Sequence, residues 1–271
     1  MKLKDKFSRF LATKLLKHPR LRVHFMQVIK DQHFNEFGMK CFLSNREYIP
    51  ISFCDSATSL GEIFIEGEYD WLPAESTPKR WLDLGCNNGY FSLLMLFRQA
   101  REKRSECEAL LVDGDPRFSK AIESINDSLK LAQNLRFEQG LIGPKVPEAN
   151  FALHGGMVSR IESELNDNCS NLAVPILSEK NIMNQLAPPY DLVKVDIEGA
   201  EADFLQNYPT VLQHTKTLII EWHSWNSQKM PADQFKELLL AQGFKTVKEC
   251  KSQQLDGETD PTTLHTYFCQ K

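Results

Sequence analysis

The sequence predicts a doubly wound α/β domain, in which helices cover both faces of a mostly parallel sheet. From about residue 80 onward, short apolar runs alternate with segments whose apolar residues recur at helical spacing. The first run ends in a glycine turn, and polar residues follow each of the next runs. Such alternation forms parallel sheets through right-handed crossovers, and ligands bind beyond the carboxyl ends of the strands. We therefore expect the functional residues at those ends.

The elements follow in order along the chain. Five apolar runs are expected as parallel strands: 81–84, 109–113, 135–139, 191–196 and 217–221. Helices are expected at 90–99, at 116–132, from about 200, and at 231–240 with Gly243 as its end. A final strand pair is expected at 244–249 and 265–269, joined by a polar loop with Asp256 and Gly257. The segment 144–180 is polar and irregular and receives no element.

The bulk composition is that of an ordinary globular protein, with 42% hydrophobic and 25% charged residues. A length of 271 residues suits one large α/β domain with a short appendage. The net charge of −4 gives no overall attraction to nucleic acid. Seven cysteines without a CxxC pair predict reduced thiols and a cytoplasmic location. No apolar run approaches the roughly 20 residues that cross a bilayer.

The first 30 residues are strongly basic, with nine lysines and arginines against one acid, Asp5. Apolar residues recur there at helical spacing: Leu3, Phe7, Phe10, Leu11 and Leu15. We expect residues 1–50 to form a helical extension that precedes a main domain at 51–271. The helix either contacts an anionic membrane peripherally or packs its apolar stripe on the main domain or a partner subunit.

A candidate cofactor site lies at residues 81–93, which read as a strand, a glycine turn and a helix start. Gly85 and Gly89 allow a tight turn and a close approach to a ligand. A dinucleotide-binding GxGxxG turn needs a middle glycine, and this chain has Asn87 there. The turn therefore suits a ligand without a diphosphate, and S-adenosylmethionine fits. Asp83 would meet its ammonium group directly or through water, and Cys86 and Asn88 complete the loop.

The next strand ends in Asp113, whose carboxylate is placed to accept hydrogen bonds from both ribose hydroxyls. The alternative is that Asp113 or Asp115 caps the helix expected from Pro116, and Asp115 fits such a cap. After the third strand, Gly140 and Leu141 would lie along the adenine together with Gln139.

These motifs resemble those of FkbM-type class I S-adenosylmethionine-dependent methyltransferases. WLDLGCNNGYFSL (81–93) resembles motif I, LLVDGDP (110–116) resembles the acidic second motif, and DLVKVDIEGAEADFL (191–205) resembles the family's DxEGAE signature. EIFIEGEYDWL (62–72) and the pair Glu221 and His223 are also similar to family segments. The resemblance covers about residues 55–225. The chain has Asp113-Gly114 where members often have Glu-Pro.

The resemblance implies a Rossmann-like seven-stranded sheet with an antiparallel last strand, the class I methyltransferase fold. It also implies S-adenosylmethionine as methyl donor and S-adenosylhomocysteine as product. The acceptor would be a hydroxyl of a small molecule, usually a sugar, a glycan or a natural product.

On the acceptor side, a base or a metal should assist the hydroxyl, because an alcohol is a poor nucleophile. The candidates are Asp196, Glu198, Glu221 and His223, and Asp196 would also line the cofactor. His223, with an ordinary pKa near neutrality, suits proton removal. Asp196 and Glu198 would point the same way if the strand continued through Glu198. With Glu221 they would bind a divalent cation, or one of them would orient His223.

Two of these candidates, Glu198 and His223, also have a purely structural alternative. Glu198 and Glu201 would complement a helix N-terminus, and His223 would be a satisfied core histidine. Trp222 and Trp225 would stack on an acceptor ring or pack in the core. The role of Lys194, inside an apolar strand, stays open.

Two other functions compete with methyl transfer. A nucleotide-sugar glycosyltransferase would use Asp113 and Asp115 as a DxD metal site. A non-catalytic scaffold would keep the methyltransferase fold without turnover, although the turn, Asp113 and Asp196 are intact.

Overall fold

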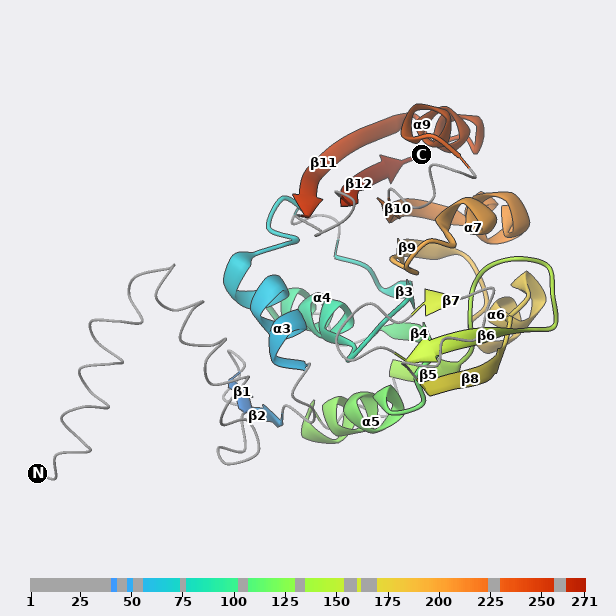
Figure 1. The fold of residues 1–271 in the computed structure, drawn as a ribbon. Coiled ribbons are helices and arrows are strands. Elements are labelled where there is room, and N and C mark those ends of the chain that lie inside the picture. Colours follow the sequence, from blue (N-terminus) through green and yellow to red (C-terminus); the bar gives the residue numbers. More distant parts are fainter. Residues whose placement is uncertain are drawn as a thin grey trace, which may run out of the picture. The chain divides into compact units, whose positions relative to one another are not determined.

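The computed structural model describes residues 40–42, 48–50, 56–73, 77–101, 107–129, 135–153, 160–161, 170–223, 230–255 and 262–271 (Figure 1). It divides the chain into two compact units, Met1–Glu68 and Tyr69–Lys271. The basic helix expected within residues 1–30 lies outside the described residues, as do Trp225 and the Asp256–Gly257 loop. The division expected at residue 50 stays a prediction.

The first unit contains a small strand pair and a short helical segment. Strand β1 (Lys40–Phe42) pairs antiparallel with β2 (Tyr48–Pro50). Helix α3 (Ser56–Gly61) continues into the π-helical turn η2 (Glu62–Glu66). Gly67 ends η2 in the left-handed conformation (φ 73°), and its N–H donates to the Glu62 carbonyl.

The second unit is built on a seven-stranded sheet with the order β11-β12-β10-β9-β3-β4-β5. The strands are β3 (Arg80–Leu84), β4 (Glu108–Asp113), β5 (Leu135–Gln139), β9 (Tyr190–Val195), β10 (Thr215–His223), β11 (Thr246–Leu255) and β12 (Thr262–Gln270). The last strand, β12, runs antiparallel to both of its neighbours, and the other pairs in β3, β4, β5, β9 and β10 are parallel. This order confirms the predicted class I methyltransferase fold.

Helices lie on both sides of this sheet, with α4 and α5 on one side and α6, α7 and α9 on the other (Figure 1). Their bounds are α4 (Tyr90–Arg101), α5 (Phe118–Leu129), α6 (Glu179–Gln185), α7 (Glu201–Asn207), α8 (Pro209–Gln213) and α9 (Ala232–Ala241). The apolar core includes Leu82, Val193, Leu218, Phe204 and Phe235, all at most 1% exposed. In the described part of the chain, no helix combines the length and apolar character needed to cross a membrane.

Several predicted boundaries shift by a few residues. Strand β10 runs to His223 rather than ending at Glu221, so both of these residues lie on the strand. Helix α5 begins at Phe118 rather than Pro116, because the Asp115 carboxylate accepts a hydrogen bond from the Arg117 N–H at 2.9 Å and forms a turn before the helix.

The segment left without an element contains a second sheet, of three strands in the order β7-β6-β8. Its strands are β6 (Glu148–Leu153), β7 (Arg160–Ile161) and β8 (Ser170–Pro175), and both pairs are antiparallel. Phe151 and Val174 are buried with Leu141 in a small core of their own. The sequence signal was weak because the apolar runs within β6 and β8 are only about three residues long and lie beside polar residues.

Candidate functional site

In the turn after β3, every second residue has a positive φ: Gly85 (74°), Asn87 (49°) and Gly89 (75°). A Cβ on Gly85 would lie 1.7 Å from the Asp196 carbonyl oxygen. Glycine is therefore required at position 85 both by the backbone angle and by the close passage of the chain that leaves β9. The turn after β3 and the end of β9 are packed against each other.

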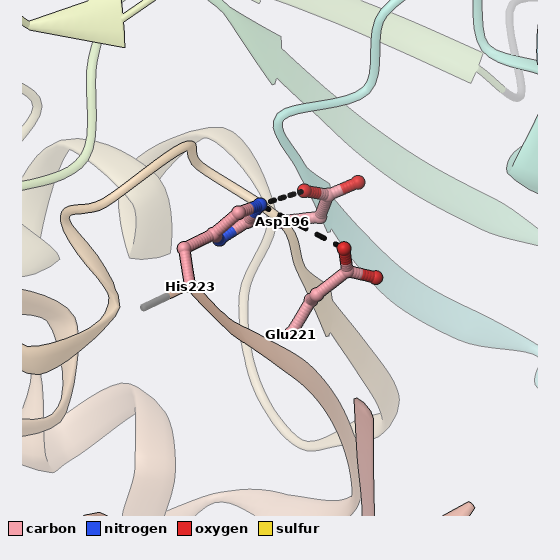
Figure 2. Close-up of side chains that lie close together, drawn as sticks. All are labelled: Asp196, Glu221 and His223. Atoms are coloured by element: carbon pink, nitrogen blue, oxygen red, sulfur yellow. Dashed lines mark ion pairs between the residues drawn. The ribbon is translucent and has the colours of Figure 1, made fainter. Parts of the chain in front are cut away.

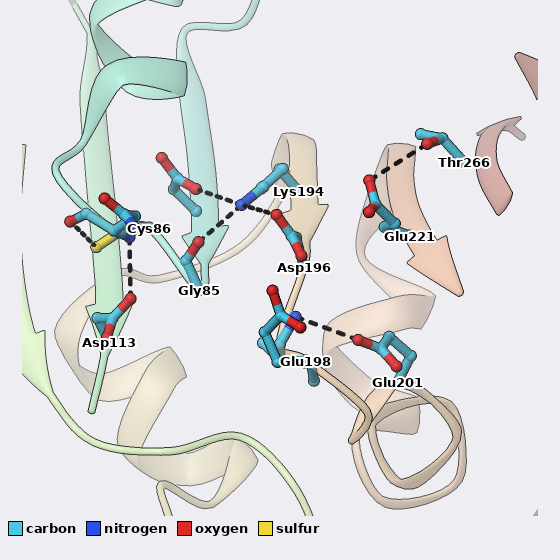
Figure 3. Close-up of polar contacts among 12 residues, drawn as sticks. Gly85, Cys86, Asp113, Lys194, Asp196, Glu198, Glu201, Glu221 and Thr266 are labelled. Carbon is cyan, nitrogen blue, oxygen red and sulfur yellow. Dashed lines mark hydrogen bonds and ion pairs between the residues drawn. The ribbon is translucent and has the colours of Figure 1, made fainter. Parts of the chain in front are cut away.

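Asp113, at the end of β4, binds this turn directly. Its Oδ2 accepts a hydrogen bond from the Asn87 N–H at 2.9 Å (Figure 3). Its Oδ1 accepts one from the Asp115 N–H at 3.0 Å. The Asn87 side chain accepts a bond from the Asn88 N–H at 2.7 Å. Burial raises the pKa of Asp113 to about 6, although these two N–H donors oppose the rise. The two strand ends that the sequence singled out therefore form one connected loop cluster.

The residues predicted to bind a cofactor fall into a partly exposed group and a buried group. Four of them are partly exposed: Gly85, Asn87, Asp113 and Asp196. The others are buried: Asp83, Cys86, Asn88, Gly89, Gly140 and Leu141. A Cβ on Gly140 would lie 2.5 Å from Leu177. The structure leaves the partly exposed four as the candidates for direct side-chain or main-chain contact with a ligand.

Asp83 lies on β3 as predicted, but its side chain is 0% exposed, so the expected direct contact with a ligand is not possible in this structure. Its Oδ2 accepts a 2.7 Å bond from Ser92, while its Oδ1 has no hydrogen-bond partner. That Oδ1 lies 3.7 Å from the Lys194 Nζ. Burial raises the pKa of Asp83, and Lys194 opposes this.

Lys194, whose role the sequence left open, links the two halves of the site. Its ammonium donates to the Gly85 carbonyl at 2.7 Å and lies 3.3 Å from the Asp196 Oδ2 (Figure 3). Burial would lower the pKa of Lys194, but Asp196 and Asp83 more than compensate and raise it. In the sequence, the sign of this role was a lysine within an otherwise apolar strand. In the sheet, Lys194 on β9 lies opposite Asp83 on β3.

The acceptor-side candidates converge on the imidazole of His223 (Figure 2). Its Nε2 lies 3.4 Å from Glu198, 3.7 Å from Glu221 and 3.9 Å from Asp196. The strand does not continue through Glu198, because β9 ends at Val195 and Glu198 has a φ of 52°. It is the turn after β9 that brings Glu198 to the imidazole.

Glu201 orients His223, a role that the sequence analysis gave to other carboxylates. Its Oε1 lies 3.0 Å from the His223 Nδ1 and accepts bonds from the N–H groups of Gly199 at 3.1 Å and Ile197 at 3.3 Å. The side chains of both residues are almost inaccessible, at 0% for Glu201 and 2% for His223. Glu201 also accepts bonds from the turn that precedes its helix, and the sequence predicted only this helix-terminus role. The contact with His223 was not predicted.

The pKa of His223 differs from the near-neutral value that the sequence analysis expected. Burial alone would lower the pKa of His223, but Glu201, then Glu198 and Asp196, raise it to about 10. Burial raises the pKa of Glu198 to about 8, with His223 opposing and the neighbouring carboxylates adding to the rise. Asp196 moves the other way, since Lys194 and His223 overcome the effect of burial and lower its pKa.

Three of these side chains could hold a metal ion. One ligand atom from each of Asp196, Glu221 and His223 lies within 4.8 Å of the other two. Glu221 also accepts a 3.3 Å bond from the Thr266 hydroxyl on β12 (Figure 3).

Two alternatives from the sequence can be judged from contacts. Trp222 is 4% exposed and its Nε1 donates to the Met230 carbonyl at 3.2 Å, so it packs in the core. The Asp115 side chain is 1% exposed and pairs with Arg117 at 2.5 Å. Of the two carboxylates of the proposed DxD metal site, only that of Asp113 is therefore accessible, which weakens the glycosyltransferase alternative.

No protein-family model matches the sequence, and a comparison with curated proteins gives no match. Solved structures align at low identity. A magnesium protoporphyrin IX methyltransferase from Synechocystis PCC 6803 with bound SAM aligns at 11% identity and a TM-score of 0.46, over 100% of this chain and 98% of that one. Methyltransferase FkbM from Methylobacillus flagellatus KT aligns at 13% and 0.42, over 70% of this chain and 44% of that one. A putative RNA methyltransferase from Pyrococcus horikoshii aligns at 11% and 0.41, over 80% and 85%.

Proposed function

We propose that this chain is an S-adenosylmethionine-dependent methyltransferase of the FkbM type that methylates a hydroxyl of a sugar, a glycan or a natural product. The observation that carries the proposal is the link between Asp113 and the Asn87 N–H. It joins the glycine turn after β3 to the acidic end of β4, next to the carboxylates that end β9 and β10. The seven-stranded fold with β12 antiparallel supports the same reading.

The residues at this edge fit an adenosyl-amino-acid ligand. A carboxylate has about four lone-pair positions, and two backbone donors occupy part of this capacity in Asp113. The remainder suits a pair of ribose hydroxyls. Asn87 occupies the place where a dinucleotide-binding turn has its middle glycine, so the turn lacks the close approach that a pyrophosphate requires. Gly85 and Asp196 would then face the amino-acid portion.

The acceptor would lie against Asp196, Glu198 and Glu221. S-adenosylmethionine supplies a methyl group on a sulfonium, and its transfer forms a C–O bond, breaks the C–S bond and releases S-adenosylhomocysteine. The chain positions the hydroxyl oxygen in line with that bond, an effect worth up to about 7–11 kcal/mol. The hydroxyl proton passes to a carboxylate of the cluster. His223, held by Glu201, fixes the arrangement of these carboxylates.

Binding assays separate this function from the glycosyltransferase alternative. We expect S-adenosylhomocysteine to bind with micromolar affinity. Uridine diphosphate, titrated into protein already saturated with Mn²⁺, should give no saturable heat. Asp113→Asn removes a charged acceptor, and we expect it to weaken S-adenosylhomocysteine binding by about 1.5–3 kcal/mol. Asp127→Asn, a change on helix α5 away from the strand ends, serves as the control. Tight binding of the diphosphate without binding of S-adenosylhomocysteine would refute the proposal.

A further inference from the structure

We propose that Asp196, Glu221 and His223 bind one divalent first-row transition-metal ion on the acceptor side of the site. The three side chains come from the end of β9 and from β10 and point toward one another (Figure 2). The role of the ion rests on the proposed function, whereas the binding of the ion does not.

The spacing of the three ligand atoms fits a shared ion better than direct hydrogen bonds. The His223 Nε2 lies 3.7 Å from the Glu221 Oε1 and 3.9 Å from the Asp196 Oδ1. Both distances exceed a hydrogen bond. Two ligands of an octahedral ion with bonds of about 2.1 Å are separated by about 3.0 Å when adjacent and by about 4.2 Å when opposite. The two separations from the His223 Nε2 lie between these limits, and one ligand atom of each residue lies within 4.8 Å of the other two.

The imidazole is held as metal-binding histidines are held. A ligating histidine usually has its other ring nitrogen bonded to a carboxylate, which fixes the orientation of the ring. Here the Nδ1 of His223 contacts the Glu201 Oε1 at 3.0 Å, and two backbone N–H groups hold that oxygen in place. The Nε2 is thereby directed at the carboxylates.

The composition of the site indicates the class of ion. One imidazole with two carboxylates suits Mn²⁺, Fe²⁺, Co²⁺ or Zn²⁺, whereas Mg²⁺ and Ca²⁺ prefer oxygen ligands alone. Glu198 adds a further carboxylate 3.4 Å from the Nε2. Lys194, at 3.3 Å, contacts Asp196 from the side of the glycine turn, so the Asp196 Oδ1 remains directed toward His223.

An ion at this position would lie where the acceptor hydroxyl is proposed to bind. A Lewis acid there would polarise the hydroxyl and stabilise the oxygen as its proton leaves. Glu198 would face the same hydroxyl from the turn after β9.

The test titrates the full-length protein, dialysed against a chelator, with MnCl₂ by calorimetry, in the absence of any adenosyl ligand. The diagnostic variant is Glu221→Gln, which keeps the size of the side chain. The control is Glu249→Gln, which removes the carboxylate of another histidine pair, His265 with Glu249 at 3.0 Å. Asp196→Asn is a second ligand variant, and circular dichroism confirms that each variant is folded.

We expect one saturable Mn²⁺ site per chain, weakened at least about tenfold by Glu221→Gln and by Asp196→Asn. Glu249→Gln should bind as the wild type does. Co²⁺ added to the wild type should give a visible absorption band that Glu221→Gln lacks. The absence of a saturable site, or equal affinity in wild type and a folded Glu221→Gln variant, would overturn the proposal. Because no adenosyl ligand is present, a failure here is distinct from a failure to bind S-adenosylhomocysteine.

Discussion

Asp113 combines two tasks in one carboxylate, because it holds the glycine turn and is proposed to hold a ribose. Its oxygens accept bonds from Asn87 and Asp115, and burial raises its pKa to about 6. A carboxylate accepts hydrogen bonds from both hydroxyls only when it is ionised. The pH dependence of ligand binding below pH 7 should therefore report Asp113, because the other partly exposed carboxylate of the site with a raised pKa, Glu198, has a pKa of about 8.

We predict that S-adenosylhomocysteine affinity is full above pH 7 and is lost as the pH falls through about 6. The sign follows from the raised pKa, since Asp113 becomes protonated as the pH falls through that value. At pH 5 about a tenth of the carboxyl groups remain ionised, so affinity should fall about tenfold. Calorimetry from pH 5 to 8 measures this. Asp113→Asn should bind weakly and with little pH dependence, and a wild-type affinity that is constant over this range would contradict the assignment.

Lys194 is a positioning residue, because its ammonium joins the Gly85 carbonyl to the carboxylates of Asp83 and Asp196. Lys194→Met would leave the buried carboxylate of Asp83 and the partly exposed carboxylate of Asp196 without this cation, and we expect a loss of about 3–5 kcal/mol in the free energy of unfolding. The matched control is Lys271→Met, whose ammonium donates to two main-chain carbonyls near the surface. That change should cost at most about 1 kcal/mol. Urea unfolding measures both, and similar losses would show that Lys194 has no special structural role.

Among the elements, the turn between β3 and α4 depends on the strand beside it. Gly85 and Gly243 have similar backbone angles, with φ of 74° and 85°. A Cβ on Gly85 would collide with the Asp196 carbonyl, whereas a Cβ on Gly243 would meet nothing within 4 Å. The two glycines therefore separate backbone strain from close packing.

Gly243→Ala should cost about 1–2 kcal/mol, which is the strain of a left-handed alanine. Gly85→Ala should cost more than about 3 kcal/mol, because the end of β9 must also move. Thermal and urea unfolding compare the two variants. Equal losses in the free energy of unfolding would mean that the chain after β9 can move away from residue 85 at little cost. That result would contradict the close packing of the glycine turn against Asp196.

The elements also show what the sequence could and could not predict. The strands of the main sheet and the placement of Asp113 at the end of β4 follow from apolar runs and from polar residues at their ends, both of which are local signals. The sheet of β6, β7 and β8 was missed because the apolar runs within β6 and β8 are only about three residues long and lie beside polar residues. Glu201 was assigned only to a helix terminus, because its contact with His223 joins α7 to β10, 22 positions apart in the chain. Such contacts depend on the tertiary fold.

For the whole molecule, the sheet order explains why residues far apart in sequence act at one place. Strands β4, β3, β9 and β10 are consecutive neighbours and parallel, so their carboxyl ends share one edge. The glycine turn and Asp113 lie at one part of this edge, and Asp196, Glu221 and His223 lie at the next. This order places a proposed cofactor site beside a proposed acceptor site.

A crystal structure of the protein with bound S-adenosylhomocysteine tests this account most directly. We predict that both ribose hydroxyls lie within about 2.5–3.2 Å of the Asp113 carboxylate, that the amino-acid portion lies along the turn at Gly85, and that the sulfur faces Asp196. A ligand bound elsewhere, or with its ribose away from Asp113, would contradict the account.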